Sequence, residues 1–95
     1  MLEEVCSKCI AKYGEENQMD IAIEELSELI QAICKWKRNT TPADTVMLRD
    51  HVIEELVDVE IVSKQLYMMF VGDSEEEYEA MKRYKLNRQK ERLNE

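Results

Sequence analysis

Residues that break helices are almost absent from this sequence, and the three that occur divide it into four segments. Gly14, Pro42 and Gly72 are its only glycines and its only proline, whereas residues that favour helices, such as Ala, Leu, Glu, Lys and Met, are plentiful. In the first three segments the apolar residues recur at helical spacing. We therefore predict an all-α fold. The predicted helices cover residues 2–13, about 16–38, 42–70 and about 75–93.

Short sequence signals predict where two of these helices begin. Thr41 followed by Pro42 is typical of a helix start, with Thr as the N-cap and Pro at the first helical position. Asp44 completes a weak capping box there, and Ser74 with Glu77 forms a second one. We expect the side chains of Thr41 and Ser74 to cap the helices that follow them.

The length of the chain and the apolar character of the segment 42–70 predict how the helices pack. Ninety-five residues make a single domain, 1–95, for which we expect an antiparallel bundle of about four helices. The helix over 42–70 is apolar around much of its circumference, which one small chain would struggle to bury. We therefore predict that homo-oligomerisation, at least to a homodimer, completes the bundle.

The charge of the chain is acidic but unevenly distributed. The formal net charge is −8, and residues 1–81 hold 7 Lys and Arg against 19 Asp and Glu. Residues 82–95 hold 6 Lys and Arg against 2 Asp and Glu. An acidic body argues against a general binder of nucleic-acid polymers, which needs a basic face. The basic segment either meets an anion locally or is the solvated end of a helix.

Cysteine usage and hydropathy bear on the compartment. Three cysteines, an odd number, fit a reduced cytosolic protein better than a disulfide scaffold. No apolar run approaches the roughly 20 residues that cross a bilayer, and the first residues are acidic, without the apolar core of a signal peptide. We predict a cytoplasmic protein without a membrane partner.

The spacing Cys6-x-x-Cys9 resembles half of a zinc site. The other half would require a second close pair of ligands, and only Cys34 and His51 remain, far apart in the sequence. Two interpretations stay open, a structural zinc site and a pair of small buried thiols that pack as apolar residues.

Two acidic segments carry the main functional signal. Each holds two carboxylates three residues apart, Glu25 with Glu28 and Glu55 with Asp58. Residues three apart share a helix face. Glu55 also lies in an apolar row, and a carboxylate there is costly unless it is paired, hydrogen-bonded or bound to a metal. The residues of that row around it are Leu48, Val52, Val59 and Val62.

Two antiparallel helices would bring these four carboxylates together as an oxygen-only site. Such a site suits Mg²⁺ or Mn²⁺, not zinc or copper, and Mg²⁺ in a small helical protein suggests chemistry on phosphate esters or phosphoanhydrides. The alternative is that the acids form salt bridges only. A di-iron bundle needs Glu-x-x-His pairs, and Leu48 stands three residues before His51, the only histidine.

The pattern Glu24-Glu25-x-x-Glu28, followed by Glu55-x-x-Asp58, resembles the EExxE…ExxD signature of the MazG-like all-α nucleoside triphosphate pyrophosphohydrolases. Gly14 and Gln18 ahead of the first half, and a helix end rich in Lys and Arg after it, also resemble the short members. The resemblance covers roughly residues 14 to 70.

The resemblance implies an enzyme that splits an NTP or dNTP into the monophosphate and pyrophosphate, and it implies a homodimer or a dimer of dimers. The metal ligands it implies are Glu25, Glu28, Glu55 and Asp58, for Mg²⁺ or Mn²⁺. Glu24 would be an outer acid or the general base for a water that attacks the α-phosphorus in line.

Cationic and aromatic residues are the remaining candidates for contacts with the nucleotide. For the phosphates they are Lys35, Arg38, Lys82, Lys85 and Arg88. For the base, Trp36 and Tyr67 could stack on it, and packing in the core or an interface is the alternative role of Trp36. The competing function is a non-catalytic helical dimer, an interaction or regulatory module whose acidic face binds a basic partner.

Overall fold

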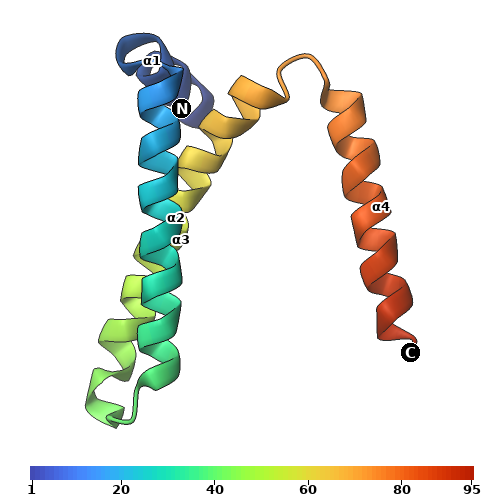
Figure 1. The fold of residues 1–95 in the computed structure, drawn as a ribbon. Helices are drawn as coiled ribbons and strands as arrows, with labels where there is room; N and C mark the ends of the chain where they lie inside the picture. Colours follow the sequence, from blue (N-terminus) through green and yellow to red (C-terminus); the bar gives the residue numbers. More distant parts are fainter.

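The computed structural model describes all residues, 1–95, and it is entirely helical (Figure 1). It contains no strand, as the near absence of Gly and Pro predicts. The elements are α1 (Leu2–Tyr13), α2 (Glu15–Arg38), a 3-10 turn (Pro42–Asp44), α3 (Thr45–Phe70) and α4 (Glu75–Leu93). The predicted all-α class and the predicted helix bounds are thus confirmed to within three residues.

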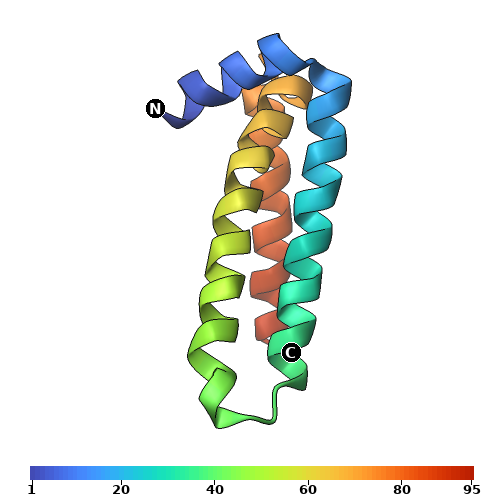
Figure 2. The same ribbon diagram turned by 90° about the vertical axis from the view of Figure 1, so that its left-hand side faces the viewer.

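The centre of the molecule is an antiparallel hairpin of α2 and α3, with α1 lying across its open end (Figures 1 and 2). Gly14 separates α1 from α2 and has a φ of 91°, a backbone angle that residues other than glycine rarely adopt. This sharp turn lets α1 pack against both long helices. The antiparallel hairpin, in turn, brings carboxylates of α2 and α3 to face one another.

The predicted capping of α3 and α4 is wrong in its details. Neither Thr41 nor Ser74 caps its helix through its side chain. In the loop before α3, Asn39 makes the side-chain bonds instead: its Oδ1 accepts a 2.9 Å bond from the N–H of Thr41, and its Nδ2 donates a 3.3 Å bond to Oγ1 of Thr45. The Asn side chain closes an Asx-type turn, and Pro42 starts a 3-10 turn before α3 begins.

The core of the chain is small. Its buried apolar residues are Cys6, Ala22, Ala32 and Val62. Three polar residues are buried with them, Gln18, Glu55 and Gln65. Nε2 of Gln18 donates a 2.6 Å hydrogen bond to Oε1 of Gln65, so these two amides satisfy each other between α2 and α3. Of the buried polar side chains, only Glu55 retains an oxygen without a partner.

The predicted four-helix bundle does not form within one chain, because α4 packs against none of the other helices (Figure 1). It touches the rest of the molecule at its first turns, where the rings of Tyr67 and Tyr78 meet edge to face with centroids 4.9 Å apart. Charged residues dominate α4, so it lacks the continuous apolar stripe that would hold it on the hairpin.

The molecule exposes more surface than a folded chain of its size. Its accessible surface is 7701 Å², whereas a compact monomer of this mass exposes about 5,700 Å². The radius of gyration is 16.8 Å, against about 12 Å for a compact domain of this length. None of the helices combines the length and the apolar character that a bilayer span requires.

Candidate metal centre

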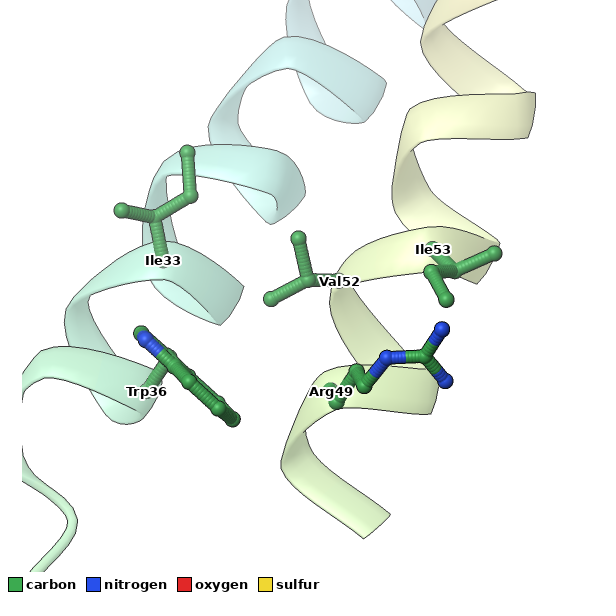
Figure 3. A pocket seen from close by; sticks show the side chains of 5 residues that line it. All are labelled: Ile33, Trp36, Arg49, Val52 and Ile53. Atoms are coloured by element: carbon green, nitrogen blue, oxygen red, sulfur yellow. The ribbon is translucent and has the colours of Figure 1, made fainter. Parts of the chain in front are cut away.

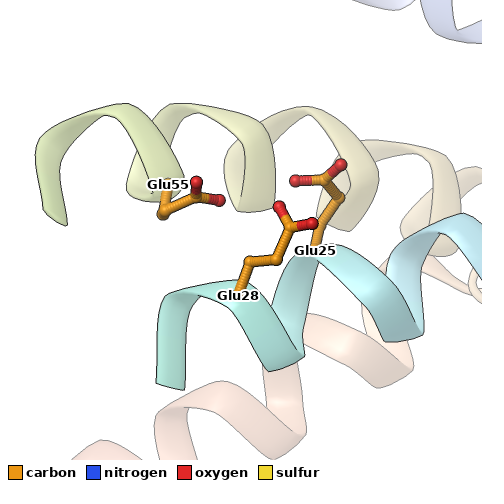
Figure 4. A group of neighbouring side chains, drawn as sticks. All are labelled: Glu25, Glu28 and Glu55. Atoms are coloured by element: carbon orange, nitrogen blue, oxygen red, sulfur yellow. The ribbon is translucent and has the colours of Figure 1, made fainter. Parts of the chain in front are cut away.

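Three of the four predicted ligands meet in the groove between α2 and α3. One carboxylate oxygen from each of Glu25, Glu28 and Glu55 lies within 4.8 Å of the other two. Figure 4 shows the side chains of Glu25 and Glu28 rising from α2 toward Glu55, which reaches across from α3. The spacing of three residues puts Glu25 and Glu28 on one face of α2, so the helix itself aims both acids at α3.

The three carboxylates differ in how far they are removed from water. Glu55 is only 7% exposed, Glu25 is half-buried and Glu28 is exposed. Oε2 of Glu25 and Oε2 of Glu55 are both buried without a hydrogen-bond partner. Buried polar atoms are almost always satisfied in folded proteins. The two unpartnered oxygens thus belong to neighbouring acids of one cluster.

Burial and mutual repulsion raise the pKa values of two of these groups. Burial is the largest cause of the raised pKa of Glu25, followed by the charges of Glu28, Asp58 and Glu55. The pKa of Glu55 is also raised by burial first, then by Glu28 and Asp58, while His51 opposes the change. Without a cation the cluster therefore binds protons more readily than isolated carboxyls do.

Asp58 and Glu24 hold different places from the three clustered acids. Asp58 is half-buried and lies outside the group whose oxygens meet, although its charge still raises the pKa values of Glu25 and Glu55. Glu24 is exposed and also outside the cluster. Asp58 is therefore close enough to act on the cluster by its charge, whereas Glu24 faces water.

His51 contacts the cluster, which the sequence reasoning missed. Its Nε2 lies 3.4 Å from Oε1 of Glu55, one helical turn away on α3. The i, i+4 spacing of the two residues was the available signal. The sequence predicts no role for His51 other than that of a metal ligand. In the structure its Nε2 lies beside Oε1 of Glu55, and Oε2 of that carboxylate has no hydrogen-bond partner.

A shallow apolar groove of about 550 Å³ lies between the end of α2 and the start of α3 (Figure 3). Its lining residues are Ile33, Trp36, Arg49, Val52 and Ile53. Val52 precedes Glu55 by three residues, which is about 4.5 Å along the helix axis. Trp36, the only tryptophan, is 42% exposed, and in Figure 3 its indole lies flat along the groove beside Val52.

The cationic candidates are not gathered at the cluster. Lys35 and Arg38 are exposed in the last turns of α2, and Lys35 stands about 10 Å along the axis beyond Glu28. Lys82, Lys85 and Arg88 lie on α4, which meets the hairpin only at its start, where Tyr78 contacts Tyr67 of α3.

The other aromatic and the cysteines also lie apart from the carboxylates. Tyr67 follows Glu55 by about 18 Å along α3 and packs against Tyr78 at the start of α4. The Cys6 thiol is buried and donates a weak 3.6 Å hydrogen bond to the carbonyl of Ile61. Burial raises the pKa of this thiol, as does the neighbouring Cys9. Cys6 thus packs as a small apolar group.

Comparisons with protein-family models, with curated proteins and with solved structures give no match to this chain. The function proposed below therefore rests on the EExxE…ExxD motif and on the geometry of the carboxylate cluster.

Proposed function

We propose that the chain is a Mg²⁺-dependent nucleoside triphosphate pyrophosphohydrolase of the MazG-like kind, which converts an NTP or dNTP into the monophosphate and pyrophosphate. The observation that carries this proposal is the buried Glu55 carboxylate, which meets Glu25 and Glu28 and keeps one oxygen without a hydrogen-bond partner. A surface that only binds basic proteins has no reason to place an acid there, because burying it is costly.

The residues of the cluster fit a hard divalent cation. All of the donors are carboxylate oxygens, which suit Mg²⁺ or Mn²⁺, and the two unpartnered oxygens need a positive charge. Glu25, Glu28 and Glu55 would hold the ion, and Asp58 would join them by a change of side-chain rotamer. When bound, the ion would neutralise phosphate charge and activate water.

The remaining roles follow from position. Glu24 is the proposed general base, since it is exposed next to the cluster and thus keeps an ordinary carboxylate's access to water. The groove beside Trp36 would take the base of the nucleotide, because it begins about one helical turn from Glu55. Lys35 and Arg38 are exposed in the last turns of α2, from where they would contact phosphates of the nucleotide.

Homo-oligomerisation forms part of the proposal. The chain exposes about 2,000 Å² more than a compact monomer of its mass, which is the area per chain that large obligate interfaces cover. Exposed apolar side chains supply such an interface, among them Ile23, Ile30, Val46 and Leu56. We propose a homodimer or a dimer of dimers.

Pyrophosphate release from a panel of NTPs and dNTPs, with Mg²⁺ and with EDTA, tests the reaction. Release with Mg²⁺ alone, together with the monophosphate, is the expected result. Glu55→Gln should lower kcat at least about 100-fold, as the loss of an electrostatic contact in the transition state does. Glu54→Gln is the matched control, because Glu54 is the adjacent acid but is exposed, and it should stay active.

The competing function is a helical interaction module, favoured by the large exposed apolar surface. It predicts no turnover of any nucleotide and no heat of Mg²⁺ binding by calorimetry. That pair of results would replace the enzymatic proposal.

A further inference from the structure

His51 touches the carboxylate cluster, yet the proposed function gives it no role. It is the only histidine of the chain, and its Nε2 lies 3.4 Å from Oε1 of Glu55. The imidazole is 38% exposed, whereas the side chain of Glu55 is 9% exposed. One end of a buried carboxylate therefore meets a ring that is still open to water.

The geometry of α3 accounts for this contact. His51 and Glu55 are four residues apart, so they share one face of the helix. Side chains of an α-helix lean toward its N-terminus, which brings the long side chain of Glu55 back over the turn that carries His51. The contact follows from α3 alone and needs no support from another element.

A pair with the same spacing on α1 shows why burial matters. Nζ of Lys8 lies 3.0 Å from Oε1 of Glu4, but both side chains are largely exposed. Such a pair contributes little, because water competes for both groups. Glu55 is buried, so a donor beside its Oε1 has little competition from water.

The two oxygens of Glu55 have different surroundings. Oε1 lies beside His51, whereas Oε2 is buried and has no hydrogen-bond partner. Imidazole offers an N–H donor, and carboxylates that ligate metals are commonly held by hydrogen bonds from residues outside the ligand set. Because Mg²⁺ demands nearly ideal octahedral geometry, a carboxylate whose rotamer is already fixed loses less side-chain entropy on binding it.

We infer that His51 is a positioning residue of the cation site: its Nε2–H holds Oε1 of Glu55, and Oε2 is thereby left to the ion. The inference rests on the proposed function only in requiring a divalent cation at the carboxylate cluster, and the nucleotide does not enter it. His51 itself stays outside a ligand set that consists of oxygens. The 3.4 Å separation of Nε2 and Oε1 shortens to ordinary hydrogen-bond length when the ion fixes the carboxylate.

Manganese binding tests this role without any turnover. Mn²⁺ is titrated into the full chain, and the electron paramagnetic resonance signal of the unbound ion gives the Kd. His51→Ala should raise the Kd about 10-fold, as the loss of an outer hydrogen bond to a metal ligand does. His51→Gln should stay within about threefold of the wild-type Kd, since the amide Nε2 of Gln can donate to Oε1 from a similar position.

The exposed pair on α1 supplies the matched control. Lys8→Ala removes the partner of Glu4 at the same spacing, and it should leave the Kd for Mn²⁺ unchanged. Circular dichroism and urea unfolding without metal show whether each variant keeps its fold. If His51→Ala does not fold, His51→Phe takes its place, because it keeps a ring but has no N–H.

The imidazole itself gives a second measurement. Because His51 is the only histidine, its ring signals need no assignment in a chain that carries ¹⁵N-labelled histidine. Long-range ¹H–¹⁵N spectra at one fixed pH, with saturating Mg²⁺, should show hydrogen on Nε2. A ring with hydrogen on Nδ1 alone could not donate to Glu55 through Nε2, and the inference would then be wrong.

The outcomes separate the positioning role from the proposed function. If the wild-type chain binds Mn²⁺ and His51→Ala binds it equally well, His51 has no positioning role and the cation site stands. If His51→Ala and His51→Gln weaken binding alike, donation to Glu55 is also overturned, and ¹⁴N modulation of the Mn²⁺ spin echo would show that the ring ligates the ion directly. If the wild-type chain binds no Mn²⁺, the proposed function fails together with the positioning role.

Discussion

The α2–α3 hairpin and α4 are both long and rich in charge, yet they bury their residues very differently. Six of the seven buried residues lie on the hairpin, and the seventh, Cys6, packs onto it from α1. No residue of α4 is buried. The hairpin helices approach closely because small residues, Ala22 and Ala32, lie between them.

The difference shows where charge is costly. On α4 the charged residues meet water, and the acidic start and basic end suit the helix dipole. On the hairpin, Oε2 of Glu25 and Oε2 of Glu55 are buried without a hydrogen-bond partner. A glutamate on α4 is therefore solvated at little cost, whereas Glu25 and Glu55 on the hairpin are costly to bury, and the proposed cation site is built on these two.

The largest expected change in stability comes from enlarging a small residue in the hairpin. Ala32 is 1% exposed, and Ala32→Leu should lower the free energy of unfolding by about 1–3 kcal/mol, because the groove between the helices must open. Ala80→Leu on α4, where Ala80 is exposed, should change it by less than about 0.5 kcal/mol. Urea unfolding of both variants measures the contrast, and equal losses would mean that α4 is packed as tightly as the hairpin.

An effect of similar size is expected at the buried amide pair. Gln65→Leu removes the acceptor of the 2.6 Å bond and leaves Nε2 of the buried Gln18 without an acceptor, which should cost about 1–3 kcal/mol. The double variant Gln18→Leu, Gln65→Leu should recover much of this loss, since no polar group is then left unsatisfied. Thermal unfolding of the three variants completes the cycle, and a double variant as unstable as the sum of both singles would contradict it.

The unpartnered carboxylates should also make the metal-free protein sensitive to pH. The pKa values of Glu25 and Glu55 are raised in the folded chain, so above the ordinary carboxyl pKa of 4.5 the folded state holds more protons than the unfolded state. Stability in EDTA should therefore fall as pH rises from 4.5 through the raised values, and level off above them. Glu55→Gln should flatten this decline, and Mg²⁺ should offset it in the wild-type chain.

Two urea titration series, with EDTA and with Mg²⁺, measure this dependence. An EDTA series in which stability rises steadily with pH across that window would contradict raised pKa values for the two acids. Glu54→Gln, at an exposed position next in sequence, should leave the slope as it is in the wild-type chain.

The sequence predicts local structure better than it predicts the place of each helix. The bounds of α2 and α4 follow from apolar spacing and from Gly72, because these are properties of neighbouring residues. The burial of Glu55 is confirmed for a similar reason, since the apolar row around it fixes which face of α3 turns inward. The sequence does not predict that Asn39 closes the turn before α3, because several polar residues there compete for the same turn.

The separation of α4 from the hairpin could not be read from its sequence. Its helical pattern is clear, but its apolar residues form no continuous stripe, so nothing local specifies a partner surface. The resemblance to the MazG-like family, the identity of the cation and the oligomeric state stay predictions for a related reason. Each depends on molecules beyond the single chain.

The smallest expected effect lies at the junction of the two regions. Tyr67 and Tyr78 are in edge-to-face contact there, and Tyr78→Leu keeps an apolar side chain while removing the aromatic pair. Because this one contact joins α4 to the hairpin and buries no residue of α4, the melting temperature should fall less than with Gln65→Leu. The orientation of α4 is the sharper readout, measured by energy transfer between a dye on the exposed Cys34 and one on Asn94→Cys, in chains diluted with unlabelled protein.

If Tyr67 and Tyr78 set the direction of α4, the distance distribution broadens in the variant. If a second chain holds α4, the distance distribution of the Tyr78→Leu variant stays narrow in the oligomer and broadens only on dilution to monomers. The two outcomes therefore distinguish a helix held by the Tyr67–Tyr78 contact from a helix held by a partner chain.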